Sequence, residues 1–212
     1  MLAIFKREFK SYFQNVIGWL FVAALLAVYG LYFYVYNLKN GYPYISYDLK
    51  GIGFIMMIAV PILTMRSLSD EKKTKTDQLM LTSPVSVGRI VAGKYLAMAA
   101  VYTIDIALFA LSPLVLSIYG KVALSEAYVA LFGYWLYGLS CIAVGLFISS
   151  ISESVIISAI LTFAALFLSY MMQSITGLIS SSGNLLTKVL NCFDLYTPFE
   201  NFVSGCFSVT SA

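Results

Sequence analysis

The sequence has no histidine and few charged residues. Lysine, arginine, aspartate and glutamate make up 11% of its 212 residues, whereas a soluble globular domain carries about 25%. Without histidine, the commonest general base and the commonest zinc ligand are both missing. The three cysteines, Cys141, Cys192 and Cys206, show no C-x-x-C spacing, which argues against a metal site. The composition therefore disfavours a metal-dependent or histidine-dependent enzyme, and it excludes a nucleic-acid-binding protein.

Most of the chain is apolar instead. Hydrophobic residues make up 60% of the sequence, and its mean hydropathy is +0.87. Because about 20 apolar residues cross the hydrocarbon core of a bilayer, the chain predicts an all-α polytopic membrane protein that forms a single transmembrane domain over residues 1–212. The five expected spans are residues 16–36, 51–68, 90–119, 127–149 and 154–177.

Residues 1–14 predict an amphipathic helix that lies in the membrane interface. Apolar residues recur at spacings of three and four, as on one face of a helix, and basic residues lie off that stripe. No small-residue cleavage site follows, and the next apolar run is long enough to span, so this start is not a cleaved signal peptide. The apolar stripe is Leu2, Phe5, Phe9 and Phe13, and the basic residues are Lys6, Arg7 and Lys10.

Three residues inside the expected spans are unusual for a bilayer. Pro61 and Pro113 predict helix kinks, since proline removes a backbone hydrogen bond. Asp105 is an ionisable group inside a span, where such a group is costly and suggests function. It has two interpretations: it lines a substrate or proton path, or it hydrogen-bonds to serine, threonine or tyrosine within the bundle.

Residues 88–95, GRIVAGKY, match most of the phosphate-binding pattern G-x-x-x-x-G-K-[ST]. The last position is Tyr95, which cannot supply the magnesium-binding hydroxyl. The preceding LTSPVS is no buried strand, and a membrane span follows. We therefore expect no ATP site here: Gly88 allows the chain to turn into the bilayer, and Lys94 extends its ammonium to water at the end of the span.

Basic residues are distributed unequally between the two sides of the membrane. Placing the N-terminus inside is therefore favoured by the positive-inside rule, and this orientation leaves residues 178–212 outside. In that late segment Cys192 and Cys206 are either two free thiols or a disulfide, which requires an oxidising compartment. The inside would hold Lys6, Arg7, Lys10, Arg66, Lys72, Lys73, Lys75, Arg89 and Lys94, and the outside Lys39, Lys50, Lys121 and Lys188.

The most charged segment, residues 67–89, lies between the second and third spans. Read from its residues alone, it is either a solvated loop or a short surface helix that docks on another protein, because the apolar patch QLML stands between charges. The stretch PILTMRSLSDEKKTKTDQLMLTSPVSVGRIVAGKY resembles the corresponding loop of ABC-2-type transporter permeases, and most closely the gliding-motility and copper-processing branch. SSISES, residues 149–154, similarly resembles the family's turn between spans four and five, and residues 1–14 resemble its elbow helix.

The resemblance implies a permease that does no chemistry. Two permease subunits would pair in the cytoplasmic membrane, N-termini inside, and two ATPase subunits would bind ATP and Mg²⁺ beneath them; the permease itself needs no cofactor, and export is the expected direction. Residues 70–84 would form the coupling helix that docks on the ATPase. Six spans are expected for the family, one more than the sequence contains, and Lys75 stands where the family often has glycine. The implied ATPase contacts are Glu71, Lys72, Thr76, Gln78, Leu79, Leu81 and Pro84, with Ser152 and Glu153 as a second contact.

Two other functions fit the sequence less well than an ABC transporter permease. An ATP-independent secondary transporter or channel-like subunit would depend on Asp105, but no internal repeat of the kind common in such transporters is visible. A membrane enzyme is disfavoured because histidine is absent and no acids cluster at one membrane depth.

Overall fold

The computed structural model describes residues 2–73, 86–119, 122–179 and 195–203, and within these residues it is helical with no strand. Five helical stretches of the described chain are long and apolar enough to cross a membrane. The chain is therefore an all-helical polytopic membrane protein, as its composition predicts. The helices are α1 Leu2–Gln14, α2 Val16–Phe33 with its π-helical extension η1 Tyr34–Lys39, α3 Ser46–Thr64, α4 Ser69–Lys73, α6 Val87–Phe109, α7 Ser112–Tyr119, α8 Leu124–Ile151, α9 Val155–Ile179 and α11 Tyr196–Val203.

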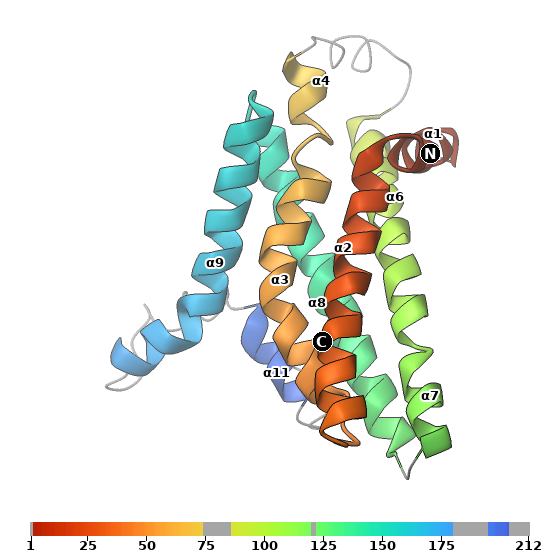
Figure 1. Ribbon diagram of the computed structural model, residues 1–212. Helices are drawn as coiled ribbons and strands as arrows, with labels where there is room; N and C mark the ends of the chain where they lie inside the picture. Colours follow the sequence, from red (N-terminus) through yellow and green to blue (C-terminus); the bar gives the residue numbers. More distant parts are fainter. Residues whose placement is uncertain (1, 74–85, 120–121, 180–194, 204–212) are drawn as a thin grey trace.

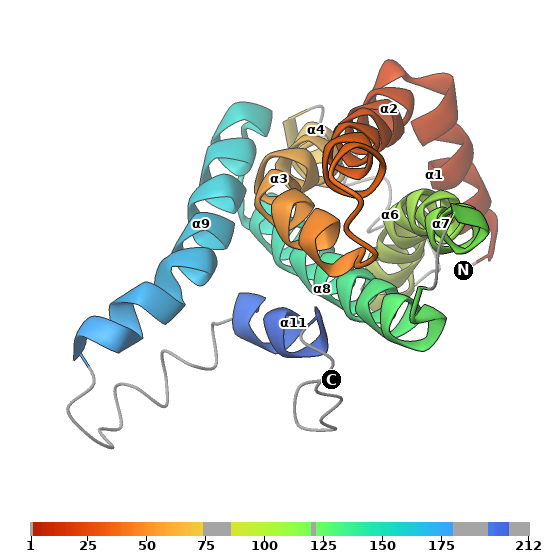
Figure 2. The same cartoon turned by 60° about the horizontal axis from the view of Figure 1, so that its bottom comes forward.

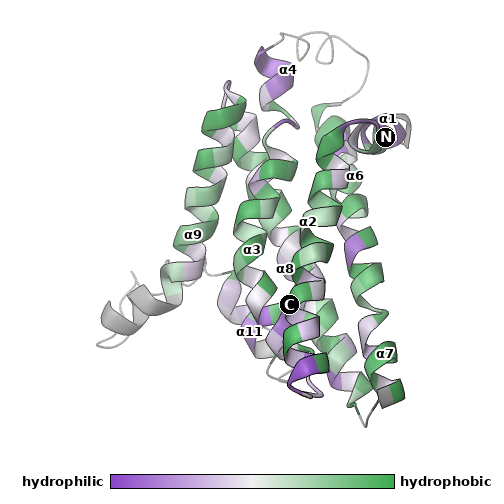
Figure 3. Ribbon diagram, viewed as in Figure 1, coloured by the Kyte–Doolittle hydropathy of each residue, from purple (hydrophilic) through white to green (hydrophobic). Residues whose placement is uncertain are grey.

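Helix α3 is the centre of the bundle. It packs against α2, α8 and α9, while α6 packs against α2 and α8 (Figures 1 and 2). Its core residues Leu49, Ile52, Met56, Val60 and Leu63 are fully buried. Apolar side chains also cover the outer faces of the long helices, where Ile156 is 70% exposed; such faces suit a lipid environment, and Figure 3 shows them as long apolar stretches.

Polar elements gather at one end of the bundle, which we call the α4 end. Helix α1 lies across this end beside α6, α4 projects from it, and the turn between α8 and α9 is also there (Figure 1). Figure 3 shows hydrophilic residues on α1 and α4. At the opposite end α11 packs against α8, and the ring of Phe199 stacks on Tyr137 with centroids 5.2 Å apart.

Helix α3 begins earlier than the sequence predicts. Asp48 and Lys50 are charged, so the span was expected to start at Gly51, whereas the helix starts at Ser46. Asp48 is nevertheless fully buried, and Asn37 Nδ2 donates a hydrogen bond to its Oδ2. This hydrogen bond from η1 satisfies one carboxyl oxygen of Asp48, whereas its Oδ1 has no hydrogen-bond partner in the described part of the chain.

The two prolines have different surroundings. Pro61 lies within α3, which continues to Thr64. Near Pro113 the third span is interrupted: α6 ends at Phe109 and α7 starts at Ser112, so the proline occupies the first turn of a new helix, where its missing N–H costs nothing. The helix is therefore interrupted at Ala110 and Leu111, just before Pro113, where the sequence predicts a kink.

Because α6 packs closely on α8, replacing glycine by alanine is expected to affect stability very differently at two positions. A Cβ atom at Gly138 would overlap the Tyr102 ring, which is fully buried and donates a hydrogen bond to Tyr134 O at 2.6 Å, whereas a Cβ at Gly30 meets no atom within 4 Å. We expect Gly138→Ala to lower the free energy of unfolding by about 1–3 kcal/mol through overpacking. Gly30→Ala is the matched control and should be neutral or stabilising. Thermal unfolding in detergent measures both, and equal melting temperatures would contradict the packing.

Candidate functional site

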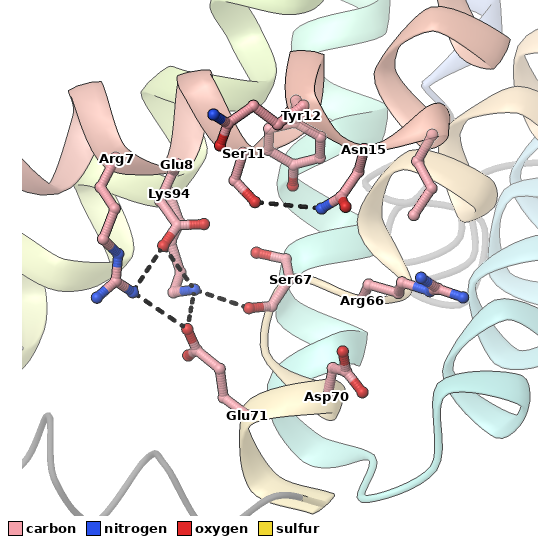
Figure 4. Close-up of a pocket in the computed structure, with 12 residues that line it drawn as sticks. Arg7, Glu8, Ser11, Tyr12, Asn15, Arg66, Ser67, Asp70, Glu71 and Lys94 are labelled. Atoms are coloured by element: carbon pink, nitrogen blue, oxygen red, sulfur yellow. Dashed lines mark hydrogen bonds and ion pairs between the residues drawn. The ribbon is translucent and has the colours of Figure 1, made fainter.

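A polar cavity of about 490 Å³ lies at the α4 end. Its walls come from α1, the connection between α3 and α4, α4 itself and α6, so it joins elements that are far apart in the sequence (Figure 4). Both signs of charge line it. The charged lining residues are Arg7, Glu8, Arg66, Asp70, Glu71 and Lys94.

Lys94 is the most buried charge of this cavity, with a side chain that is 2% exposed. Its Nζ donates hydrogen bonds to Glu71 Oε1 at 2.6 Å and to Ser67 O at 2.8 Å, and it lies 3.6 Å from Glu8 Oε1. The expectation that Lys94 extends to water is therefore wrong. The sequence suggested it because the lysine is near the end of a span, but α1 crosses this end and supplies a carboxylate.

Four of the six charged residues that line the cavity are connected by ion pairs. Arg7 Nη2 is 3.0 Å from Glu8 Oε1 and 3.8 Å from Glu71 Oε1. The side chain of Arg7 is 63% exposed, whereas those of Glu8 and Glu71 are 14% and 18% exposed. Two cations and two carboxylates thus form a neutral cluster that becomes more buried toward Lys94, and breaking a buried pair is far costlier than breaking an exposed one.

The beginning of α4 is fixed on its other side by the end of α8. Ser149 is fully buried, and its Oγ accepts hydrogen bonds from the backbone N–H groups of Leu68 and Ser69, each at 3.2 Å. The hydroxyl groups of Ser69 and Ser149 are 3.0 Å apart. Lys72 Nζ donates to the Ser150 carbonyl near the end of α8, where cations are favoured. A side chain from another helix thus caps α4, satisfying N–H groups that every helix start leaves unpaired.

A comparison with protein families gives one match over nearly the whole chain. The family model described as "ABC-2 family transporter protein" covers residues 11–209. The chain belongs to this family. Members are membrane subunits of ABC transporters, they are generally not enzymes, and they work with an ABC ATPase. Comparison with curated proteins and with solved structures found no match.

The site residues expected from the ABC-2 resemblance fall into two groups. Glu71 and Lys72 lie in α4, and Ser152 and Glu153 lie in the turn after α8, at the same end of the bundle. The hydrogen bonds of Ser149 and Ser150 connect these two regions. The remaining residues lie outside the described part of the chain: Thr76, Gln78, Leu79, Leu81 and Pro84, as does the possible Cys192–Cys206 pair.

Sequence reasoning missed the roles of Ser149 and Lys94. The serine-rich end of α8, SSISES, was the available signal for Ser149, because hydroxyl side chains are the usual caps of helix N-termini. For Lys94 the signal was its position well inside a helix that begins at Val87. Neither signal names the partner, since Glu8 and Ser67 come from other elements.

Burial and the nearby carboxylate of Glu8 raise the pKa of Tyr12, which also lines the cavity. The phenol therefore stays protonated over the physiological pH range. Its ring packs against the core of the bundle, so α1 is held to the bundle by apolar contacts as well as by its charges.

Asp105 lies away from this cavity, in the part of α6 that is buried inside the bundle. It is fully buried, and neither carboxylate oxygen has a hydrogen-bond partner in the described part of the chain. The hydrogen bonds expected to serine, threonine or tyrosine are therefore not formed. No group of three or more metal-binding side chains occurs among the described residues, so Asp105 belongs to no candidate metal site in that part of the chain.

Because Ser149 caps α4 and Ser150 does not, replacing each serine by alanine should affect stability and hydrogen exchange differently. Ser149→Ala removes the acceptor for two N–H groups, and we expect it to lower stability by about 0.5–2 kcal/mol and to increase amide hydrogen exchange in residues 67–73. Ser150→Ala is the control, because the Ser150 hydroxyl bonds only within its own helix, to Phe147 O at 2.6 Å. Equal exchange in the two variants would rule out the cap.

Burial of Asp105 without partners predicts that its carboxyl group destabilises the protein. Asp105→Leu should raise the free energy of unfolding by about 1–3 kcal/mol, because a buried unpaired polar group is removed. ATP hydrolysis by the complex purified with this chain should persist in both Asp105→Leu and Asp105→Asn. If the correctly folded Asp105→Asn variant lost this ATP hydrolysis, the carboxyl group would instead be assigned to a transport path.

Proposed function

We propose that this chain is the permease subunit that couples ATP hydrolysis by a separate ATPase to outward substrate movement across the cytoplasmic membrane. One observation carries the proposal: the first turn of the segment expected to couple is fixed to the bundle on both sides. Ser149 holds it to α8, and Lys94 holds it to α6. A force applied to this segment would therefore reach the membrane helices directly.

Residues 70–84 are proposed as the coupling helix that sits in a cleft of the ATPase. Ser152 and Glu153 are proposed as a second, smaller contact. Both regions lie at the α4 end, where a single partner surface can reach them (Figure 1). Glu71 is already engaged by Lys94, so its proposed role is to hold the coupling helix, while the apolar Leu79 and Leu81 would supply the contact area.

The α4 end is proposed as the cytoplasmic end. The positive-inside rule favours this orientation, and α1, α4 and the α8–α9 turn share that end, as a cytoplasmic N-terminus requires. The membrane would then be the cytoplasmic membrane, and α11 would lie on its outer side.

A complete transporter would contain two permease and two ATPase subunits. The exposed apolar face of α9 suits either lipid or a second permease. ATP closure of the ATPase pair would favour one arrangement of the membrane helices through differential binding. The loop sequence further supports membership of the gliding-motility and copper-processing branch, within which some relatives act as mechanical assemblies.

The alternative, an ATP-independent transporter centred on Asp105, is less well supported. Family membership points to an ATPase partner, and the sequence has no histidine to pass a proton to or from Asp105.

The proposal predicts that a polar substitution prevents ATPase binding at the α4 end of the bundle but not at the opposite end. Leu79→Ser should remove the ATPase from the complex purified in mild detergent, and with it the vanadate-sensitive ATP hydrolysis, because docking helices bind through apolar side chains. Ile118→Ser makes the same kind of change at an 80% exposed position of the opposite end and should leave both unchanged. Mass spectrometry of the wild-type complex must find a chain with a P-loop and an ABC signature; its absence would contradict the proposal.

A further inference from the structure

We infer that Lys94 is a positioning residue that makes α1, α4 and α6 move as one unit. The inference rests on the proposed function, since it specifies how movement of the coupling segment enters the membrane domain. It assigns a role to α1, whose Arg7 and Glu8 belong to the charge cluster (Figure 4).

The first argument is the cost of burying an ammonium group. A charge removed from water is tolerated only when it is paired and hydrogen-bonded. Lys94 is 2% exposed, and its compensation comes from Glu71 Oε1, Ser67 O and Glu8 Oε1 at 2.6, 2.8 and 3.6 Å. Separating these groups leaves a buried charge unpaired, which is strongly unfavourable.

The second argument is where the partners come from. Glu71 belongs to α4, Ser67 to the connection that precedes it, and Glu8 to α1, while Lys94 itself belongs to α6. A single ammonium is thus shared by three helices. If α4 shifts, the Lys94 ammonium must move with the Glu71 carboxylate. Glu8 must then move as well, or its ion pair with Lys94 is lost.

The third argument is that apolar packing alone would not impose the same coupling. Helix α1 packs on α6, and its Phe9 and Phe13 side chains pack against the buried core of the bundle. Apolar contacts of this kind are non-directional. They keep helices adjacent while permitting them to slide. The charge cluster adds direction and register at the position where α4 begins.

Spin-label distances in nanodiscs test the inference on the chain alone. Exposed Lys6 in α1 and Lys73 in α4 are replaced by cysteine and labelled, with the three native cysteines changed to serine. The decisive variant is Lys94→Met with Glu71→Gln, which removes the pairs of Lys94 together with the longer and more exposed Arg7–Glu71 pair at 3.8 Å. It leaves no uncompensated carboxylate, because Glu8 keeps Arg7 at 3.0 Å. We expect a narrow distance distribution in the parent and loss of that narrow distribution in the double variant, at an unchanged helical content.

Lys72→Met is the matched control. It also removes a lysine that donates to a backbone carbonyl, but this bond joins α4 to α8. The α1–α4 distribution should therefore stay narrow. A double variant as narrow as the parent, or a Lys72→Met variant as broad as the double variant, would overturn the inference.

The complex with the co-purified ATPase, trapped with ATP and vanadate, tests the movement itself. Trapping should leave the α1–α4 distance unchanged in the parent and shift it in the double variant, where α4 moves without α1. No shift in the double variant would overturn the inference. If no ATPase binds the parent chain, the proposed function fails, whereas the measurements on the chain alone still decide the role of Lys94.

Discussion

A lysine ammonium placed out of water must be surrounded by acceptors, and the α4 end of this protein is organised by that requirement. Lys94 needs a carboxylate from α4, a carbonyl from the chain before it and a second carboxylate from α1. Each requirement fixes the position of another element. Helix α1, the first turn of the proposed coupling segment and α6 are consequently held in one arrangement.

The fold follows from the sequence to the extent that the bilayer imposes it. Within the hydrocarbon core every backbone polar group must be satisfied internally, so long apolar runs become helices. The sequence predicts five spans, and the described residues contain five helical stretches long and apolar enough to cross a membrane. Element ends are less predictable because they depend on tertiary contacts. Asp48 appears to the sequence reader as a loop residue, yet its hydrogen bond from Asn37 places it inside α3.

The candidate site was predictable only in its location. Charge, apolar patches and family resemblance all directed attention to residues 67–89. The groups that hold this segment come from elsewhere: Glu8 from the first helix and Ser149 from the fourth span. A local pattern cannot name such partners, because they become neighbours only when the helices pack. The same reason applies to Asp105. The sequence contains many hydroxyl groups that could hydrogen-bond to it, but in the described part of the chain neither of its carboxyl oxygens has a hydrogen-bond partner.

The two ends of the bundle are held by different kinds of interaction, and the proposed mechanism gives this difference a consequence. At the α4 end the contacts are directional: the Lys94 ion pairs and the Ser149 hydrogen bonds resist sliding. At the α11 end many contacts are aromatic, as between Tyr137 and Phe199 or Tyr170 and Tyr196, whose ring centroids are 5.2 and 4.7 Å apart. The ion pair of Lys50 with Glu200 at 3.1 Å also lies there, but its side chains are about one-third exposed, so it is far cheaper to break than the pairs of Lys94. Aromatic contacts can be exchanged for others of similar energy without leaving a charge unpaired. A permease driven from one end needs this asymmetry, since the driven end must transmit force as a rigid unit while the far end rearranges. The distribution of polar and aromatic contacts therefore supports the same direction of force as the proposed coupling helix.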